Sequence, residues 1–324
     1  MRDRTDGLVT GPPATTAGTF VHRALFYRGG TEYLARVGGF VRGALAAAEP
    51  VLVAVPGPRL DALRENLGAS AAAEVTWADM TRWGRNPGRV LAALSDFADR
   101  CADRPARILG EPIWPGRTRA EVREATRHEA LINTAFAGRR ATVLCPYDAV
   151  GLPTAVLADA RRTHPTLIDG GRHLRSTVYA DASAVCADCD PPLAEPDGAV
   201  SRFEYAPGQL GAVREYVVAW ARGTSLGPGR RGDLVLAVSE AAANSLSHGG
   251  GRGTLRLWNS AGSGGVAEIR DGGRLSDPLA GRRRPSLASP HGGRGLWLIH
   301  QLCDLVEIRA SADGLTLRLH MTAR

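Results

Sequence analysis

Residues 233–248 read DLVLAVSEAAANSLSH, and this stretch decides the fold of the C-terminal third of the chain. Its apolar positions recur every three to four residues and predict an amphipathic helix with one buried face: Leu234, Val238 and Ala241. Glu240, Asn244 and His248 recur every fourth residue on another face, so their side chains stack in one line. An aligned carboxylate and amide oxygen can hold Mg²⁺ with its waters and substrate phosphates. On this segment alone, a solvated helix face remains the alternative.

Two glycine-rich segments follow this helix. Asp271-Gly272-Gly273 ends a predicted strand; the glycines let backbone approach a flat ligand, and the carboxylate can accept a hydrogen bond from an exocyclic amine. His291-Gly292-Gly293-Arg294-Gly295 directly precedes an apolar helix, whose free amides and positive end can cradle a phosphate. Each segment alone also fits an ordinary turn.

The order and spacing of the three elements resemble the N, G1 and G2 boxes of the GHKL superfamily, specifically the RsbW-like anti-sigma-factor kinases. The resemblance implies an ATP·Mg site in which Glu240 acts as general base or orients a water, Asn244 coordinates Mg²⁺, and Asp271 binds the adenine amine. The residues predicted to bind nucleotide are Asn244, His248, Asp271, Gly273, Gly293, Arg294, Gly295 and Leu296.

The segment 274–290 corresponds to the ATP lid of this family. Arg274 occupies the region where the G1 box usually has a further glycine, which leaves the seating of the nucleotide open. Arg282, Arg283 and Arg284 lie in the lid, where they can meet the γ-phosphate; a solvated, mobile loop is the alternative for each of them.

The remaining C-terminal pattern groups helices with antiparallel strands and predicts an α/β sandwich, the Bergerat (GHKL) fold. Expected helices cover Ala206–Trp220, Asp233–Ser247 and Gly295–Leu302, and expected strands cover Thr254–Trp258, Val266–Arg270, Leu305–Arg309 and Leu315–His320. The last two strands form a hairpin that turns at Asp313-Gly314.

The first half of the chain alternates short aliphatic runs with helical patterns, which indicates βαβ units and a parallel sheet. Expected strands are His22–Tyr27, Val51–Val55, Val75–Ala78, Arg107–Leu109, Thr142–Cys145 and Thr166–Asp169, and the first helix is expected over Glu32–Ala48. The predicted domains are a flexible N-terminus (1–18), a parallel-sheet domain (19–175), a linker (176–201) and the ATP-binding domain (202–324).

Three motifs of the parallel-sheet domain resemble the MEDS sensory domain, which often precedes such ATPase domains in actinobacterial regulators: Gly110–Trp114, Arg127–Asn133 and Pro146-Tyr147-Asp148. The resemblance implies a RecA/Rossmann-like fold. The strand Val51–Val55 leads into Pro56–Arg59 without a phosphate-binding lysine, so the domain is expected to sense a small-molecule ligand rather than hydrolyse a nucleotide.

All 40 basic residues are Arg, since the sequence contains no Lys; such composition is typical of GC-rich coding, as in actinobacteria. The absence of Lys excludes a Walker-A phosphate loop, a Schiff-base enzyme and a eukaryotic-type kinase. The net charge of +7 is spread among acidic residues, so we expect no direct nucleic-acid partner. Without a long apolar run or an export signal, the chain is expected to be cytoplasmic with no membrane contact.

Two further motifs have competing interpretations. His128-Glu129 suits a histidine-kinase phosphoacceptor, but the paired helices of such a box would directly precede the ATP domain, whereas strands, helices and the linker intervene here. Cys186-Ala-Asp-Cys189 has the spacing of half a zinc site or a redox pair, with His164 and His173 as candidate further ligands. Structural roles are the alternative for both motifs.

The sequence therefore predicts an anti-sigma regulatory protein for transcription and stress response. The C-terminal domain is expected to bind ATP and Mg²⁺ and to phosphorylate a serine of an anti-anti-sigma (STAS-type) partner, while also binding a sigma factor. The alternatives are a sensor histidine kinase-like protein and a non-catalytic, ATP-dependent protein-binding switch. A homodimer is compatible with the resemblance.

Overall fold

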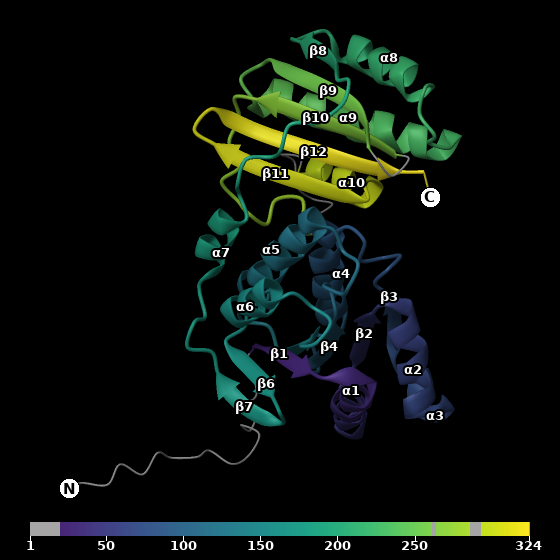
Figure 1. The fold of residues 1–324 in the computed structure, drawn as a ribbon, viewed down its shortest axis with the longest axis vertical. Helices are drawn as coiled ribbons and strands as arrows, with labels where there is room; N and C mark the ends of the chain where they lie inside the picture. The colour runs from purple at the N-terminus through teal and green to yellow at the C-terminus, as the bar shows by residue number, and fades with distance from the viewer. Residues whose placement is uncertain (1–19, 261–263, 286–292, 324) are drawn as a thin grey trace, which may run out of the picture.

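The computed structural model describes residues 20–260, 264–285 and 293–323. These residues form two bodies stacked along the long axis of the molecule, one from the N-terminal half and one from the C-terminal third (Figure 1). The predicted flexible N-terminus, 1–18, lies outside the described residues.

The N-terminal domain is built on a seven-stranded sheet in the order β3-β2-β4-β5-β1-β6-β7. Its strands are β1 (Val21–Tyr27), β2 (Val51–Val55), β3 (Thr76–Asp79), β4 (Ala106–Gly110), β5 (Ala141–Asp148), β6 (Thr166–Asp169) and β7 (Arg172–Arg175). All neighbours pair in parallel except β6 and β7. The predicted parallel sheet is confirmed. The sequence did not predict β7, because its four residues are all exposed and show no apolar alternation.

Helices cover both faces of this sheet, as parallel strands require. They are α1 (Gly29–Ala46), α2 (Gly57–Leu67), α3 (Ala69–Ala73), α4 (Pro87–Arg100), α5 (Arg119–Ala135) and α6 (Thr154–Thr163). Because successive side chains of a strand point to opposite faces, Leu25 and Tyr27 pack in the core beneath α1 and α2, while Ala24 and Phe26 pack in the core beneath α4, α5 and α6.

The C-terminal domain is an antiparallel sheet in the order β11-β12-β10-β9-β8 with helices on one face (Figure 1). Its elements are β8 (Ser201–Tyr205), α8 (Leu210–Ala221), α9 (Pro228–His248), β9 (Gly253–Ser260), β10 (Gly264–Asp271), α10 (Arg294–Leu302), β11 (Leu305–Ser311) and β12 (Gly314–Thr322). The predicted helix–sheet sandwich is confirmed, and β8 is an addition that pairs with β9 at the sheet edge.

Helix α9, which carries the motif of residues 233–248, is longer than predicted. It begins with Pro228 in the first turn, where a missing N–H costs nothing, and ends before Gly249. Its buried face packs on the sheet through small and aliphatic side chains: Leu234, Ala237, Val238, Ala241, Ala242 and Ser245. This packing fixes the rotation of α9 and so the direction of its polar line of residues.

The segment between the domains contains a short helix that its irregular sequence did not predict, α7 (Ala182–Asp188). Asp181 caps it by accepting hydrogen bonds from the backbone N–H groups of Ser183 and Ala184. Beyond α7 the chain follows the sheet face opposite the helices, where Glu195 pairs with Arg256 and Arg270. The linker is therefore bound to both domains.

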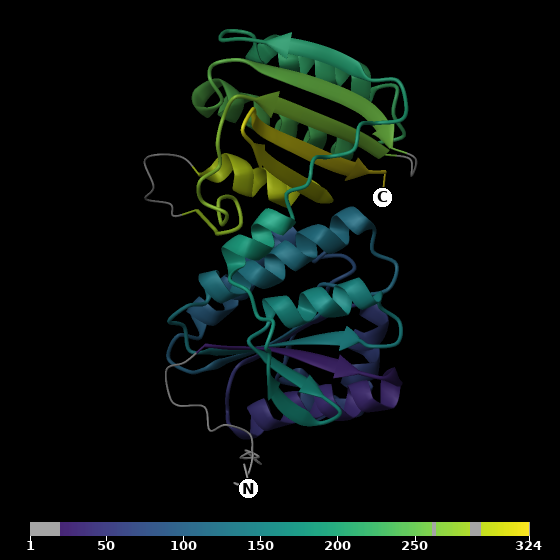
Figure 2. The same ribbon diagram turned by 60° about the vertical axis from the view of Figure 1, so that its left-hand side comes forward.

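The two domains meet where α4 and α5 lie against α10 and β11 (Figure 2). Leu279, which precedes α10 in the chain, is buried within the hydrophobic core of the N-terminal domain. Among the described residues, no helix has the length and apolar character needed to cross a membrane.

Candidate functional site

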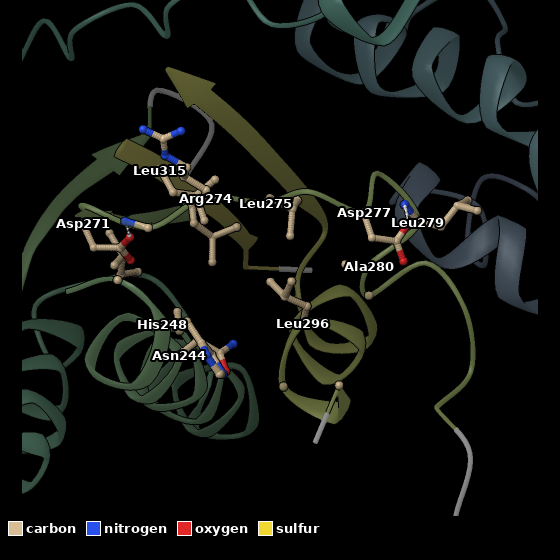
Figure 3. Close-up of a pocket in the computed structure, with 18 of the residues that line it drawn as sticks. Asn244, His248, Asp271, Arg274, Leu275, Asp277, Leu279, Ala280, Leu296 and Leu315 are labelled. Atoms are coloured by element: carbon tan, nitrogen blue, oxygen red, sulfur yellow. Dashed lines mark hydrogen bonds between the residues drawn. The ribbon is translucent and has the colours of Figure 1, made fainter. Parts of the chain in front are cut away.

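A cavity of about 480 Å³ lies in the C-terminal domain between α9, the end of β10, and α10 (Figure 3). Seven of the residues predicted to bind nucleotide line it: Asn244, His248, Asp271, Gly273, Gly293, Gly295 and Leu296. Figure 3 shows Asn244 and His248 on one helix and Asp271 at the end of the adjoining strand. Three sequence elements that are separately weak signals therefore surround one cavity.

The carboxylate of Asp271 is held by closely packed backbone. Its Oδ1 accepts a hydrogen bond of 2.7 Å from the N–H of Gly273. A Cβ at Gly273 would lie 2.7 Å from this oxygen, and one at Gly249 would lie 2.6 Å from it, so both positions require glycine. The N–H of Gly272 donates to the carbonyl of Gly249 at 3.0 Å. These contacts fix the end of β10 against the end of α9.

The N-terminus of α10 faces the cavity opposite Asp271. Gly293 precedes the helix with a φ of 80°, a left-handed conformation that favours glycine. A Cβ at Gly295 would lie 2.9 Å from Nδ2 of Asn244 and 3.3 Å from Oε2 of Glu240. The helix terminus, which favours anions, thus lies beside the amide and carboxylate that the sequence pairs.

Glu240 and Arg294 are predicted site residues that lie outside the lining of this cavity. Glu240 instead lines a neighbouring surface depression with Arg214 and Ser239, while its Oε2 reaches the vicinity of Gly295. His291 and Gly292 of the glycine-rich motif, together with lid residues 286–290, lie outside the described residues.

The first half of the lid lines the cavity through Arg274, Leu275, Asp277, Leu279, Ala280 and Gly281. Gly281 has a φ of 74°, and a Cβ there would lie 2.6 Å from Cβ of Leu296. The lid therefore packs directly on α10 at a position that only glycine fits without rearrangement. Sequence reasoning missed Gly281, although a glycine between two apolar residues and three arginines signals a turn.

The expectation that the lid arginines are either solvated or phosphate-binding is wrong for Arg282. This side chain is 2% exposed, and its Nη2 donates to Oε2 of Glu124 on α5 at 2.8 Å. Arg284 pairs with Asp96 of α4 at 3.2 Å and, with Arg283, lines the cavity. The described part of the lid, residues 274–285, is therefore docked on the N-terminal domain.

The other end of α10 is also held by the N-terminal domain. Asn86 and Arg89 at the start of α4 donate to the carbonyls of His300 and Cys303, which the end of α10 leaves unpaired, at distances of 2.6–3.2 Å. Gly88 permits this contact, because a Cβ there would overlap the imidazole of His300. One domain thus caps the helix whose opposite end faces the cavity of the other domain.

A second polar group lies where the parallel strands end, the usual ligand position in such sheets. Arg59 forms an ion pair with Glu111 and lies 3.7 Å from Asp148, and the Tyr33 hydroxyl donates to Glu111 at 3.4 Å. Burial raises the pKa of Tyr33, with the Arg59 charge opposing it, so this phenol is a donor. Two of the three motifs that resemble the MEDS domain, 110–114 and 146–148, meet here.

His128 lies in the middle of α5 with its side chain 1% exposed. Burial, outweighing the nearby Glu129 charge, lowers its pKa to about 4. A phosphoacceptor must reach the γ-phosphate of bound ATP, and an enclosed imidazole within a packed helix cannot do so without unfolding the helix. The geometry favours a structural role.

Cys186 and Cys189 are buried on and after α7. Their backbone carbonyls accept hydrogen bonds from Arg127 of α5, and Cys189 packs on Ala130. Burial raises the pKa of Cys189 to about 11, which disfavours a reactive thiolate. Within the described residues they join no third metal-ligating side chain, and all five cysteines of the chain are free thiols.

The fold and the cavity define the class of this protein: an ATPase domain of the histidine kinase-like type joined to a parallel-sheet sensory domain. Residues 203–321 match the family described as histidine kinase-like ATPase domain, and residues 21–165 match the family described as MEthanogen/methylotroph, DcmR Sensory (MEDS) domain. The chain is a MEDS domain fused to a histidine kinase-like ATPase domain, an ATP-dependent, kinase-like regulatory protein. A search of curated proteins found no match.

Proposed function

We propose that this protein is an RsbW-type anti-sigma regulatory kinase, which binds ATP·Mg²⁺ and phosphorylates a serine of a STAS-type anti-anti-sigma partner. The observation that carries the proposal is the single cavity that brings together Asn244, Asp271 and the N-terminus of α10. These groups match, in order, a metal ligand, an adenine acceptor and a phosphate cradle. The sigma factor would bind the same domain in the alternative state of the switch.

The positions of the side chains support a separate role for each end of the cavity. Asp271, held by Gly273, would accept a hydrogen bond from the adenine amine. The amides at Gly293 and Gly295 would bind phosphate, and Asn244 would hold Mg²⁺, which would neutralise phosphate charge. Glu240, beside Gly295, would position the incoming serine hydroxyl and accept its proton.

Contacts that span the two domains support control by the sensory domain. Asn86 and Arg89 hold the C-terminal end of α10, and Glu124 holds Arg282 of the lid. A ligand bound at the polar group of Arg59 and Glu111 that shifts α4 or α5 would therefore move both the phosphate-binding helix and the lid. Small displacements matter, because packed interfaces change between discrete arrangements.

A non-catalytic switch is the second candidate, and the docked lid favours it. Leu279, buried in the sensory core, and Arg282, paired with Glu124 of α5, restrain the segment that must close over ATP. In such a switch, ATP would order a protein-binding surface without phosphoryl transfer. The histidine-kinase alternative has the weaker support, since His128 is enclosed.

Incubation of the full-length protein with radiolabelled ATP and candidate STAS-type partners tests these functions. We expect the wild type to place label on a partner serine. Glu240→Ala should bind ATP but transfer no label, and Asn244→Ala should neither bind ATP nor transfer label. Glu215→Ala, at an exposed position of α8, serves as control and should behave as wild type. ATP binding without transfer to any partner would support the switch, and acid-labile label on His128 would support a histidine kinase. Failure of the wild type to bind Mg-ATP at millimolar concentration would reject all three.

Isolation of the native complex identifies the partners. In a pull-down from the native host, we expect the protein to recover a sigma factor in one state of the switch. In the other state, we expect it to recover a STAS-type protein. Recovery of neither would contradict the anti-sigma assignment but leave ATP binding untouched.

A further inference from the structure

Four metal-ligating side chains meet inside the sensory domain, away from the ATP cavity and from the polar group of Arg59 and Glu111. They are His22 of β1, Glu129 of α5, Cys145 of β5 and His164, which follows α6. Each offers one ligand atom, these atoms all lie within 4.8 Å of one another, and all four residues are buried. Four elements far apart in the sequence thus converge on one point.

The distances within the cluster are short. Oε2 of Glu129 lies 3.2 Å from Nε2 of His22 and 3.0 Å from Nε2 of His164. Sγ of Cys145 lies 3.5 Å from Nε2 of His22. A tetrahedral ion with metal–nitrogen and metal–oxygen bonds of about 2.0–2.1 Å and a metal–sulfur bond of about 2.3 Å separates neighbouring ligand atoms by about 3.3–3.6 Å. The cluster therefore needs only small adjustments to accept an ion.

The outer nitrogen of His164 fixes its tautomer. Nδ1 lies 2.8 Å from the backbone carbonyl of Ala160, which can only accept a hydrogen bond, and 2.9 Å from the Thr163 hydroxyl, which donates its own proton to the carbonyl of Asp159. Nδ1 therefore carries the proton. In the neutral imidazole, the lone pair of Nε2 then points at Glu129. A metal-binding histidine is held in this way when its second nitrogen donates to a carbonyl.

His22 is held in the same manner. Its Nδ1 lies 3.1 Å from Oδ1 of Asn133, and the Nδ2 of that amide donates to the carbonyls of Ala130 and Thr163. These two bonds fix the orientation of the amide, so its oxygen faces the imidazole and Nδ1 of His22 is the donor. Both imidazoles consequently direct unprotonated Nε2 atoms into the cluster.

The centre of the cluster lacks positive charge. With both Nε2 atoms unprotonated, neither carboxylate oxygen of Glu129 receives a hydrogen bond within the described part of the chain, and the carboxylate faces imidazole lone pairs. A buried charge so placed is strongly unfavourable unless a cation compensates it. If both imidazoles were protonated, two cations would lie with their ring centroids 3.9 Å apart and would repel each other. One divalent ion would instead accept the lone pairs of both imidazoles and compensate the charge of Glu129.

We propose that His22, Glu129, Cys145 and His164 bind one divalent transition-metal ion of the zinc type in the sensory domain. Two imidazoles, one thiolate and one carboxylate form a mixed nitrogen, sulfur and oxygen set, which suits Zn²⁺ or Co²⁺ and not Mg²⁺ or Ca²⁺. The thiolate and the carboxylate carry one negative charge each, which together balance the two positive charges of the ion. Four protein ligands close the coordination shell, so the ion has a structural or sensing role rather than a catalytic one.

The site also lies on the helix that contacts the lid. Glu129 and Glu124 are both on α5, and Glu124 pairs with Arg282 of the lid. An ion bound at Glu129 ties α5 to β1 and β5 and so sets the position from which Glu124 reaches the other domain. The metal proposal itself does not depend on ATP binding or on phosphoryl transfer.

Metal analysis of the full-length protein, purified without chelators, tests the proposal. We expect elemental mass spectrometry to find one zinc ion per chain. After exchange of zinc for cobalt, the absorption spectrum should show the visible bands of tetrahedral Co²⁺ and a sulfur-to-cobalt charge-transfer band. Cys145→Ser should lose the charge-transfer band and most of the zinc. Cys101→Ser, at a half-buried cysteine of the same domain, is the matched control and should retain both.

A positioning variant adds a readout that does not depend on loss of a ligand. Asn133→Ala removes the partner of His22 and should weaken zinc affinity about 10- to 100-fold while the cobalt spectrum keeps its shape. Wild-type protein that contains no metal and binds neither Zn²⁺ nor Co²⁺ on titration would overturn the proposal, whatever the variants do. Loss of zinc in Cys186→Ser but not in Cys145→Ser would also overturn it, by locating the ion at the other cysteine pair.

Discussion

Glu124→Gln removes the charge that joins the sensory domain to the ATP lid. The carboxylate is 1% exposed, with Oε2 at 2.8 Å from Nη2 of Arg282 and Oε1 at 2.8 Å from Nη1 of Arg309. Arg309 keeps a second partner, Glu307, at 3.0 Å, whereas Arg282 has no other carboxylate among the described residues. The substitution therefore leaves Arg282 as an uncompensated buried cation.

The size of the effect follows from this burial. Two unit charges about 4 Å apart attract by about 4 kcal/mol at an effective dielectric constant of about 20, which largely offsets the desolvation of the pair. Removal of one partner takes away the attraction but leaves the desolvation of the other, at a cost of about 3–5 kcal/mol. The lid can avoid this cost by leaving the interface, so we expect release of the lid rather than global unfolding.

Hydrogen exchange of lid residues 274–285 measures this release, together with urea unfolding. Asp96→Asn is the matched control, because Asp96 also pairs with a lid arginine, Arg284, but that arginine is 64% exposed. An exposed pair contributes about 0–1 kcal/mol, so the control should exchange nearly as wild type. If Glu124→Gln protected the lid as well as Asp96→Asn does, the docking would not depend on the buried ion pair.

Three further predictions concern the packing and ionisation of the described residues. Gly88→Ala should destabilise the protein by about 1–3 kcal/mol in thermal unfolding, since its Cβ would overlap the imidazole of His300. The control, Gly43→Ala, lies at an exposed helix position with open space around it and should be neutral or stabilising in the same assay. Gly249→Ala should weaken ATP binding more than tenfold, measured by calorimetry, because its Cβ would displace Asp271. The control, Gly229→Ala in the first turn of α9, should bind ATP as wild type does. Equal affinities of the two variants would reject the proposed role of Asp271. Burial, with the Arg282 and Arg89 charges, holds the pKa of His300 well below 6.5, so the stability it contributes is present above pH 6.5 and is lost as the pH falls toward its folded pKa. The free energy of unfolding of His300→Asn, measured in urea from about pH 7 to about pH 5, should therefore decline less steeply than that of wild type, and parallel slopes would contradict the assignment.

The secondary structure of both domains was largely predictable from local patterns. Aliphatic runs such as Val51–Val55 are rich in β-branched residues and buried on both faces, as interior strands of a parallel sheet are. The line of Glu240, Asn244 and His248 needed only helical periodicity. The elements that were missed, β7, α7 and β8, are short, and their positions depend on contacts with other elements rather than on their own apolar pattern.

The cavity was predictable to the extent that its residues come from ordered local motifs. Asn244, Asp271 and Gly295 were identified by type and spacing, and they line one cavity as expected. Gly249 was not identified, because its need for glycine arises from Asp271, which is remote from it in the chain. The roles of these residues toward a nucleotide remain predictions.

Contacts between the domains were decided by the tertiary structure alone. Glu124 and Arg282 are 158 residues apart, and each looks like an ordinary surface charge on a helix or loop. Nothing local distinguishes a glutamate that will be buried from one that faces water. Only the docking of α5 against the lid removes both side chains from solvent.

By itself, the sequence determined the two folds, their order and the motifs that line the cavity, because periodicity and glycine positions act over short stretches of chain. The tertiary structure decided that the lid is held by the sensory domain and that His22, Glu129, Cys145 and His164 converge. Such features depend on where separate elements pack, and packing is a property of the whole chain.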